Sequence, residues 1–166
     1  MKLCPTQLGI MTIIVGILMP IPVFSHSLKG AISDRDRVLN TNPNDALAVL
    51  GRGLAKLALG DNNAAIADFD RVLITNPNDD LAVLCRGLAK SALGDNNGAI
   101  ADFDRAIKIN PNLAAAYIGR GTIKLELGGK QGVIADWSKA AELLRQQGEM
   151  DLYQQVMEMI ARLEKS

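Results

Sequence analysis

A stretch of 34 residues occurs twice in direct succession, and this period constrains the fold more than any other feature of the sequence. The first copy runs from Asn44 to Pro77 and the second from Asn78 to Pro111, with 26 of the 34 positions identical. A third, looser copy runs from Asn112 to about Leu143. A unit of this size cannot bury its own apolar face, so such units stack and share a core. The period therefore predicts a repeat array.

Each full unit carries the pattern of two helices joined by a short turn. Pro43 and Pro77 each stop a helix just before a capping-type residue, and Gly60 ends the first helix in a turn of about three residues. Apolar residues recur at spacings of three and four along both halves, as on one face of a helix. In the first copy they are Leu47, Leu50, Leu54 and Leu57, followed by Ile66, Phe69, Val72 and Leu73.

A half repeat precedes the first full unit. Residues Ala31–Pro43 match Ala65–Pro77 at 10 of 13 positions, so Ser27–Pro43 is predicted to be a second helix whose first helix is missing. Arg35 stands where the full units have an aromatic residue that should pack on the unit's own first helix. A charged residue at that place avoids exposing a ring at the end of the array. The aromatic equivalents are Phe69, Phe103 and Trp137.

The pattern changes after Leu143. The second helix of the third unit is predicted to run to Gln147 and to stop at Gly148. Asp151 is then expected to cap a final helix that covers the last hairpin. Its apolar side comprises Leu152, Tyr153, Val156, Met157, Ile160 and Leu163. The predicted repeat domain is thus 27–166, divided into 27–43, 44–77, 78–111, 112–147 and a capping helix at 149–166.

Residues 1–25 lie outside the repeat and have the pattern of a secretory signal peptide. Lys2 precedes an uncharged, mostly apolar run of 12 residues from Leu8 to Met19, and Val23-Phe24-Ser25 suits a signal peptidase. The alternative is an uncleaved membrane anchor, although a bilayer needs about 20 apolar residues. We therefore expect an exported protein, in the periplasm, in a thylakoid lumen or secreted, or one anchored by this segment.

Composition argues against several classes of partner. The chain has 18 basic and 18 acidic residues, and aromatic residues make up only 4%, so neither nucleic acid nor an anionic membrane surface is an expected partner. A membrane is expected to be contacted only through an uncleaved N-terminal segment. The two cysteines, Cys4 and Cys85, form no metal or redox motif. Cys85 replaces Gly51 and Gly119, which indicates a small buried residue.

No catalytic or cofactor motif is apparent, and we expect neither enzyme activity nor a cofactor or metal. His26 is the only histidine and lies at the proposed cleavage point. Gly51-Arg52-Gly53 belongs to a helix rather than to a phosphate-binding loop. Asp61-Asn62-Asn63 and Asp95-Asn96-Asn97 lack the spaced ligands and closing glutamate of a calcium loop, and a capping and turn role explains them better.

These features together resemble the tetratricopeptide repeat (TPR) from about Ser27 to Leu143. The resemblance rests on the period of 34, the Leu-Gly turn and small and large residues that recur in register, namely Ala65 with Phe69, Ala99 with Phe103, and Pro77 and Pro111. The sequence departs from the family pattern at three positions in each unit. Val49, Val83 and Tyr117 replace its Trp; Arg52, Arg86 and Arg120 replace its Leu; and Lys56, Lys90 and Lys124 replace its Tyr. The Arg-Gly variant with Ala-Ile-Ala-Asp looks like the form abundant in cyanobacterial repeat proteins.

The resemblance implies an all-α, right-handed α-solenoid of antiparallel helix hairpins that presents a concave groove to a peptide or helix of another protein. The family's carboxylate clamp of Lys, Asn and Arg is not present at the equivalent positions, so an apolar partner segment is expected. For any one of the predicted groove residues, packing between hairpins is an equal alternative. These residues are Leu47, Leu50, Leu54, Leu57, Leu81, Leu84, Leu88, Ile118 and Leu125.

Residues at equal distances from the turn of an antiparallel hairpin face each other. Arg52 and Asp68 lie eight residues either side of Gly60, and the same relation recurs in the next two units. We expect each pair to form a charge-assisted hydrogen bond inside its hairpin, rather than to bind a partner's carboxylate. The other two pairs are Arg86 with Asp102 and Arg120 with Asp136.

The favoured function from the sequence is a non-catalytic adaptor or assembly factor. One alternative is a structural subunit that self-associates through Ile32, Val38 and Leu39 of the half repeat. Another is a truncated repeat protein with no present partner. The identity of the partner protein does not follow from the sequence.

Overall fold

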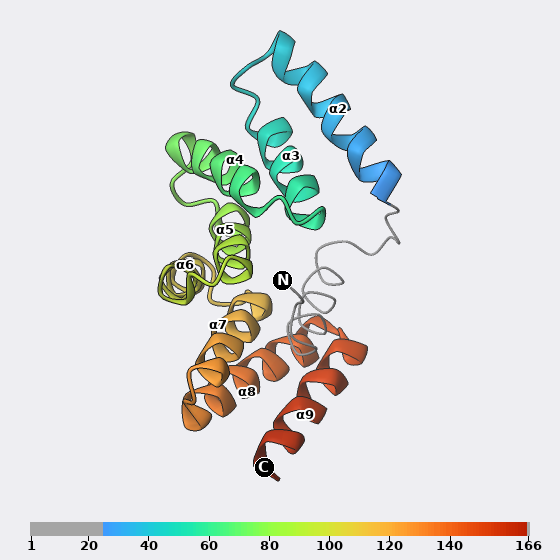
Figure 1. The fold of residues 1–166 in the computed structure, drawn as a ribbon. Helices are drawn as coiled ribbons and strands as arrows, with labels where there is room; N and C mark the ends of the chain where they lie inside the picture. The colour runs from blue at the N-terminus through green and yellow to red at the C-terminus, as the bar shows by residue number, and fades with distance from the viewer. Residues whose placement is uncertain (1–24, 166) are drawn as a thin grey trace. The chain divides into compact units, whose positions relative to one another are not determined.

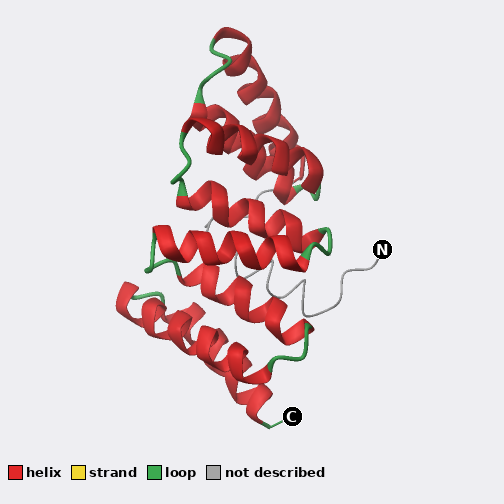
Figure 2. Ribbon diagram, turned by 90° about the vertical axis from the view of Figure 1, so that its left-hand side faces the viewer, coloured by secondary structure: helices red, strands yellow, loops and turns green. Residues whose placement is uncertain are grey.

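The computed structural model describes residues 25–165, and every regular element among them is a helix (Figures 1 and 2). The predicted signal peptide, apart from Ser25, and Cys4 lie outside the described residues. Eight helices occur in the described part: α2 (Ser25–Thr41), α3 (Ala46–Ala58), α4 (Asn62–Thr75), α5 (Asp80–Ala92), α6 (Asn96–Ile109), α7 (Ala114–Glu126), α8 (Lys130–Gln147) and α9 (Met150–Glu164). The predicted all-α class is confirmed.

The helices fall into two compact units, α2 to α6 and α7 to α9. In the first unit α3 pairs with α4 and α5 with α6, while α2 packs on α3 and α4 packs on α5. In the second unit α7 pairs with α8, and α8 packs on α9. Each predicted repeat is therefore a helical hairpin. None of the described helices has the length and apolarity needed to cross a bilayer.

Aspartate caps and glycine turns set the helix boundaries where the sequence places them. The side chains of Asp45 and Asp79 accept bonds from the backbone N–H groups three residues on, at 2.9 and 2.8 Å. Each such bond satisfies one of the N–H groups that a helix start leaves unpaired. Gly60, Gly94 and Gly128 follow the first helices with φ of 79°, 82° and 85°, a left-handed conformation that suits glycine.

An aromatic ring packed on a glycine joins the two helices of each hairpin. Phe69 and Phe103 are 0% exposed and Trp137 is 3% exposed. A Cβ atom added to Gly53 would lie 2.7 Å from the Phe69 ring, and one added to Gly121 would lie 2.7 Å from the Trp137 ring. These first helices therefore carry glycine where the ring of the second helix needs close approach. The expected packing of the aromatic residue on its own first helix is present.

α9 covers the α7–α8 hairpin and extends its core. Val156, Ile160 and Leu163 are buried against the hairpin, and Leu152 and Tyr153 are partly buried there. One sequence-based expectation for this helix, the cap at Asp151, is wrong. The helix α9 begins at Met150 after Glu149, so Asp151 lies in the first turn instead of at the cap. Met157 lines the same hollow as Tyr153 and Ile160, as expected, but is 41% exposed. The predicted stop at Gly148, with φ of 80°, is present.

Candidate functional site

Each hairpin contains a cluster of one arginine, one lysine and one aspartate, which we call the ion-pair cluster. In the first hairpin Arg52 donates to both carboxylate oxygens of Asp68, at 3.0 and 2.5 Å, and Lys56 donates to the same carboxylate at 2.8 Å. The Asp68 side chain is only 5% exposed. The three donors satisfy a carboxylate that would otherwise be costly to bury.

The second and third hairpins repeat the cluster. Arg86 donates to Asp102 at 2.9 and 2.5 Å, with Lys90 at 2.8 Å. Arg120 donates to both oxygens of Asp136, and Lys124 lies 2.7 Å from the same carboxylate. All three arginine–aspartate pairs that the sequence predicts are therefore present, and the lysines are members that sequence reasoning missed. Their recurrence at Lys56, Lys90 and Lys124, four residues after each arginine, was the available signal.

The same arginines also bond the preceding second helix in the α2–α6 unit. The second terminal nitrogen of Arg52 donates to Asp36 of α2 at 2.8 Å, and that of Arg86 donates to Asp70 of α4 at 2.6 Å. These acceptors are about half exposed, so each bond contributes less than the buried pair. The arginine thus links its own hairpin to its neighbour, a role the sequence analysis did not foresee.

The first and third clusters lower the pKa values of their aspartates. Burial alone would raise the pKa of Asp68, but the hydrogen bonds from Arg52 and Lys56 outweigh it and hold that pKa below its usual value. At Asp136 burial likewise raises the pKa, and the hydrogen bonds from Arg120 and Lys124 outweigh it and hold the pKa below its usual value. The hydrogen bond from Arg52 to Asp68 likewise raises the pKa of the guanidinium. The carboxylates of Asp68 and Asp136 are therefore charged at neutral pH.

Acid should weaken the fold through these carboxylates. When the pKa of a carboxyl group is lower in the folded chain than in the unfolded chain, the folded chain binds the proton only at a lower pH, so protonation favours unfolding. Asp68 and Asp136 therefore contribute their full stability above the unfolded pKa of about 4 and lose it as pH falls toward the lower native pKa. We expect urea midpoints to fall between about pH 5 and about pH 3. Midpoints that hold constant over this range would contradict the assignment, and Asp68→Asn should reduce the slope.

The nine predicted groove residues comprise one exposed residue, four half-buried residues and four buried residues. Leu47 is 80% exposed. Leu50, Leu54 and Leu81 are half-buried on α3 and α5, and Leu125 is half-buried against the core of the third hairpin. The buried members pack inside the fold, as the alternative role of packing anticipates; they are Leu57, Leu84, Leu88 and Ile118. The role of the nine residues toward a partner stays a prediction, and Leu47 with the half-buried leucines forms the surface available for contact.

The residues predicted for self-association also divide. Val38 is 42% exposed, Ile32 is half-buried and Leu39 is 8% exposed. Leu39 occupies the same repeat position as Leu73, which is equally buried at 8%. Leu39 therefore has little surface to offer a second copy, and Val38 is the accessible member of the three.

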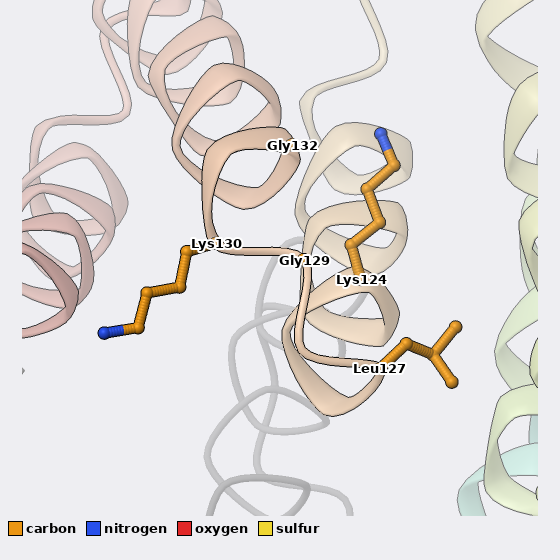
Figure 3. A pocket seen from close by; sticks show the side chains of 5 residues that line it. All are labelled: Lys124, Leu127, Gly129, Lys130 and Gly132. Atoms are coloured by element: carbon orange, nitrogen blue, oxygen red, sulfur yellow. The ribbon is translucent and has the colours of Figure 1, made fainter.

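An open hollow of about 470 Å³ lies beside the turn between α7 and α8 (Figure 3). Gly129 and Gly132 line it, together with Lys124, Leu127 and Lys130. Figure 3 shows the two lysine side chains pointing away from each other, and Lys124 bonds Asp136. These side chains do not converge on a common point, so the hollow does not have the arrangement of a small-molecule site.

The remaining candidates have structural roles. Cys85 is 0% exposed, and its burial, aided by the charge of Asp79, raises the pKa of its thiol to about 12. Such a thiol is a small apolar group rather than a nucleophile. Asp61 and Asp95 cap helices, accepting from backbone N–H groups at 3.4 and 2.9 Å. These contacts fit the capping role expected of the two Asp-Asn-Asn segments.

Comparisons with known proteins agree with this architecture. The family described as TPR repeat matches residues 87–128, which run from α5 to the end of α7. A search of curated proteins found no significant match. Among solved structures, a MamA fragment from Desulfovibrio magneticus RS-1 is similar with a TM-score of 0.68 and 21% identity, covering 74% of this chain and 69% of that one.

Two further structures have the same fold at low sequence identity. The Yersinia enterocolitica type III secretion translocator chaperone SycD gives a TM-score of 0.68 at 16% identity, covering 72% of this chain and 91% of that one. The first TPR of Spaghetti, bound to an HSP90 peptide, gives 0.63 at 19% identity, covering 72% and 90%. The chain therefore has an all-α, TPR-like fold, and its residues 87–128 match the TPR repeat in sequence.

Proposed function

We propose that this chain is a non-catalytic protein-interaction module that binds a peptide or helix of another protein through the exposed apolar residues of its first helices. The observation that carries the proposal is the position of Leu47, Leu50, Leu54 and Leu81 on α3 and α5. These leucines are exposed or half-buried, whereas the arginine and the lysine of each of these two helices are engaged in the ion-pair clusters. The surface left to a partner on these helices is therefore largely apolar.

Apolar side chains at helical spacing suit an amphipathic helix or an extended apolar segment. Leu47 and Leu54 are separated by two helical turns on α3, and α3 also contacts α5, which carries Leu81. The ion-pair clusters hold the two helices of each hairpin together. A surface fixed in this way loses little conformational entropy when a partner binds.

Proteins of similar fold support the choice of a protein partner. One is described as a secretion translocator chaperone and another as bound to an HSP90 peptide. The finer functions of adaptor or assembly factor, and the cyanobacterial type of the repeat, rest on the sequence resemblance alone. Export rests on residues 1–25 alone, and a mature chain that begins at His26, measured by intact mass, would support it.

The proposal is tested by affinity capture from the native organism with the wild-type chain and two variants. Leu47→Asp and the pair Leu50→Gln with Leu54→Gln should each lose a protein that the wild type captures, because they place polar groups on the contact surface. Leu127→Asp is the control, since Leu127 is 60% exposed but lies after α7. Thermal unfolding of each variant shows whether it remains folded. Capture that is unchanged in the folded first-helix variants would refute the proposed surface.

A further inference from the structure

The first helix of the structure, α2, occupies the place of a second helix in the repeat. Asp34, Asp68, Asp102 and Asp136 are spaced by 34 residues and hold the same position in four successive second helices. In the three full hairpins this side chain is 5–6% exposed and accepts bonds from an arginine and a lysine. The Asp34 side chain is 69% exposed, and the ion pair it has among the described residues is with Arg37 of its own helix, at 3.7 Å.

The neighbouring positions of α2 show the same contrast. Val38 is 42% exposed, whereas its equivalent in α4, Val72, is 2% exposed. Ala31 is half-buried, whereas Ala65 is 0% exposed. We call Ala31, Asp34 and Val38 the outer face of α2. It is the side that corresponds to the face of α4 covered by α3.

The opposite side of α2 is packed as in the other repeats. Asp36 accepts from Arg52 at 2.8 Å, as Asp70 accepts from Arg86 at 2.6 Å, and Leu39 is buried as Leu73 is. α2 therefore meets the next hairpin in the same way as α4 does. It differs in lacking, among the described residues, a helix on its outer face, and in carrying Arg35, whose guanidinium lies against Gly51 of α3, where α4 has Phe69.

We propose that the outer face of α2 binds a helix of a partner protein that carries arginine and lysine four residues apart on an otherwise apolar face. Charge complementarity carries the proposal. In all three hairpins the aspartate at the position of Asp34 accepts hydrogen bonds from an arginine and a lysine of the first helix. The lysine follows the arginine by four residues, so the two donors lie on consecutive turns of that helix. The small Ala31 and the apolar Val38 would lie beside that helix, as Ala65 and Val72 lie beside α3.

A second copy of the chain is a poorer occupant. The chain has three repeat-related pairs of an arginine and a lysine four residues apart: Arg52 with Lys56, Arg86 with Lys90, and Arg120 with Lys124. Each pair already bonds the aspartate of its own hairpin. Residues 1–24 carry one charged side chain, Lys2, and so cannot supply the pair either. The occupant is therefore expected to be a different protein.

The test uses the full chain and a fluorescent, helix-stapled peptide with the sequence of residues 79–95, in which Cys85→Gly removes the thiol. Anisotropy titration should show saturable binding that Asp34→Asn weakens about tenfold or more, since a charge-assisted hydrogen bond is lost. A peptide with Arg86→Gln and Lys90→Gln should lose a similar factor, and the two losses should not add. Glu158→Gln is the control, because Glu158 is also 69% exposed and also has a partner in its own helix.

Three results would overturn the proposal: no saturable binding, affinity that does not change with Asp34→Asn, or peptide affinity that survives loss of both basic groups. Sedimentation of the chain without peptide could give a fourth result that overturns the proposal. A dimer that Asp34→Asn dissociates would assign the outer face to a second copy. This surface does not include the leucines of the first helices, so the proposed function can fail or hold independently of it.

Discussion

Replacing Asp102 by alanine is expected to lower the free energy of unfolding by about 2–4 kcal/mol. The carboxylate is 5% exposed and accepts from Arg86 and Lys90, whose side chains are 16% and 24% exposed. Its removal leaves two partly buried positive charges close together without their shared counter-charge. Urea unfolding followed by circular dichroism measures the loss.

The repeat supplies a matched control for this variant. Asp34→Ala makes the same chemical change at the same repeat position, but Asp34 is exposed and lacks the buried contacts of Asp102. Its effect on stability should stay within about 0.5 kcal/mol. Equal losses from the two variants would show that the buried cluster contributes nothing beyond an ordinary surface charge.

Replacing Phe103 by alanine should cost about 3–5 kcal/mol, which is the largest effect we expect from any single substitution. The ring is 0% exposed and packs against Gly87, where an added Cβ atom would lie 3.0 Å from it. The variant loses the transfer free energy of the ring and leaves a cavity between α5 and α6. The same urea titration reports the change.

Two further variants define the cause of that loss. Phe103→Leu keeps much of the buried volume and should cost less than the alanine variant. Leu47→Ala also removes a large apolar side chain, but Leu47 is 80% exposed, so the change should stay within about 0.5 kcal/mol. A Phe103→Ala variant as stable as Leu47→Ala would contradict the role of the ring in joining the hairpin.

Local signals in the sequence were sufficient for the helices, their ends and the contacts within a hairpin. Asp45 and Gly60 act within one or two turns of their own positions, so their effect does not depend on distant residues. The pairing of Arg52 with Asp68 follows from their equal distance to Gly60 once the hairpin is antiparallel. The wrong cap at Asp151 shows the limit, because Glu149 and Asp151 are both acidic residues near the same helix start.

The sequence by itself determined the repeat, the hairpins and the arginine–aspartate pairs, because each depends on spacing along the chain. Only the tertiary structure decided which leucines are accessible, since Leu47 and Leu57 share one helical face yet are 80% and 5% exposed. Stacking also decided that Arg52 bonds Asp36 and that Asp34 stays exposed. Helical periodicity states which residues lie on one face, but the neighbouring helices determine how much of that face they cover.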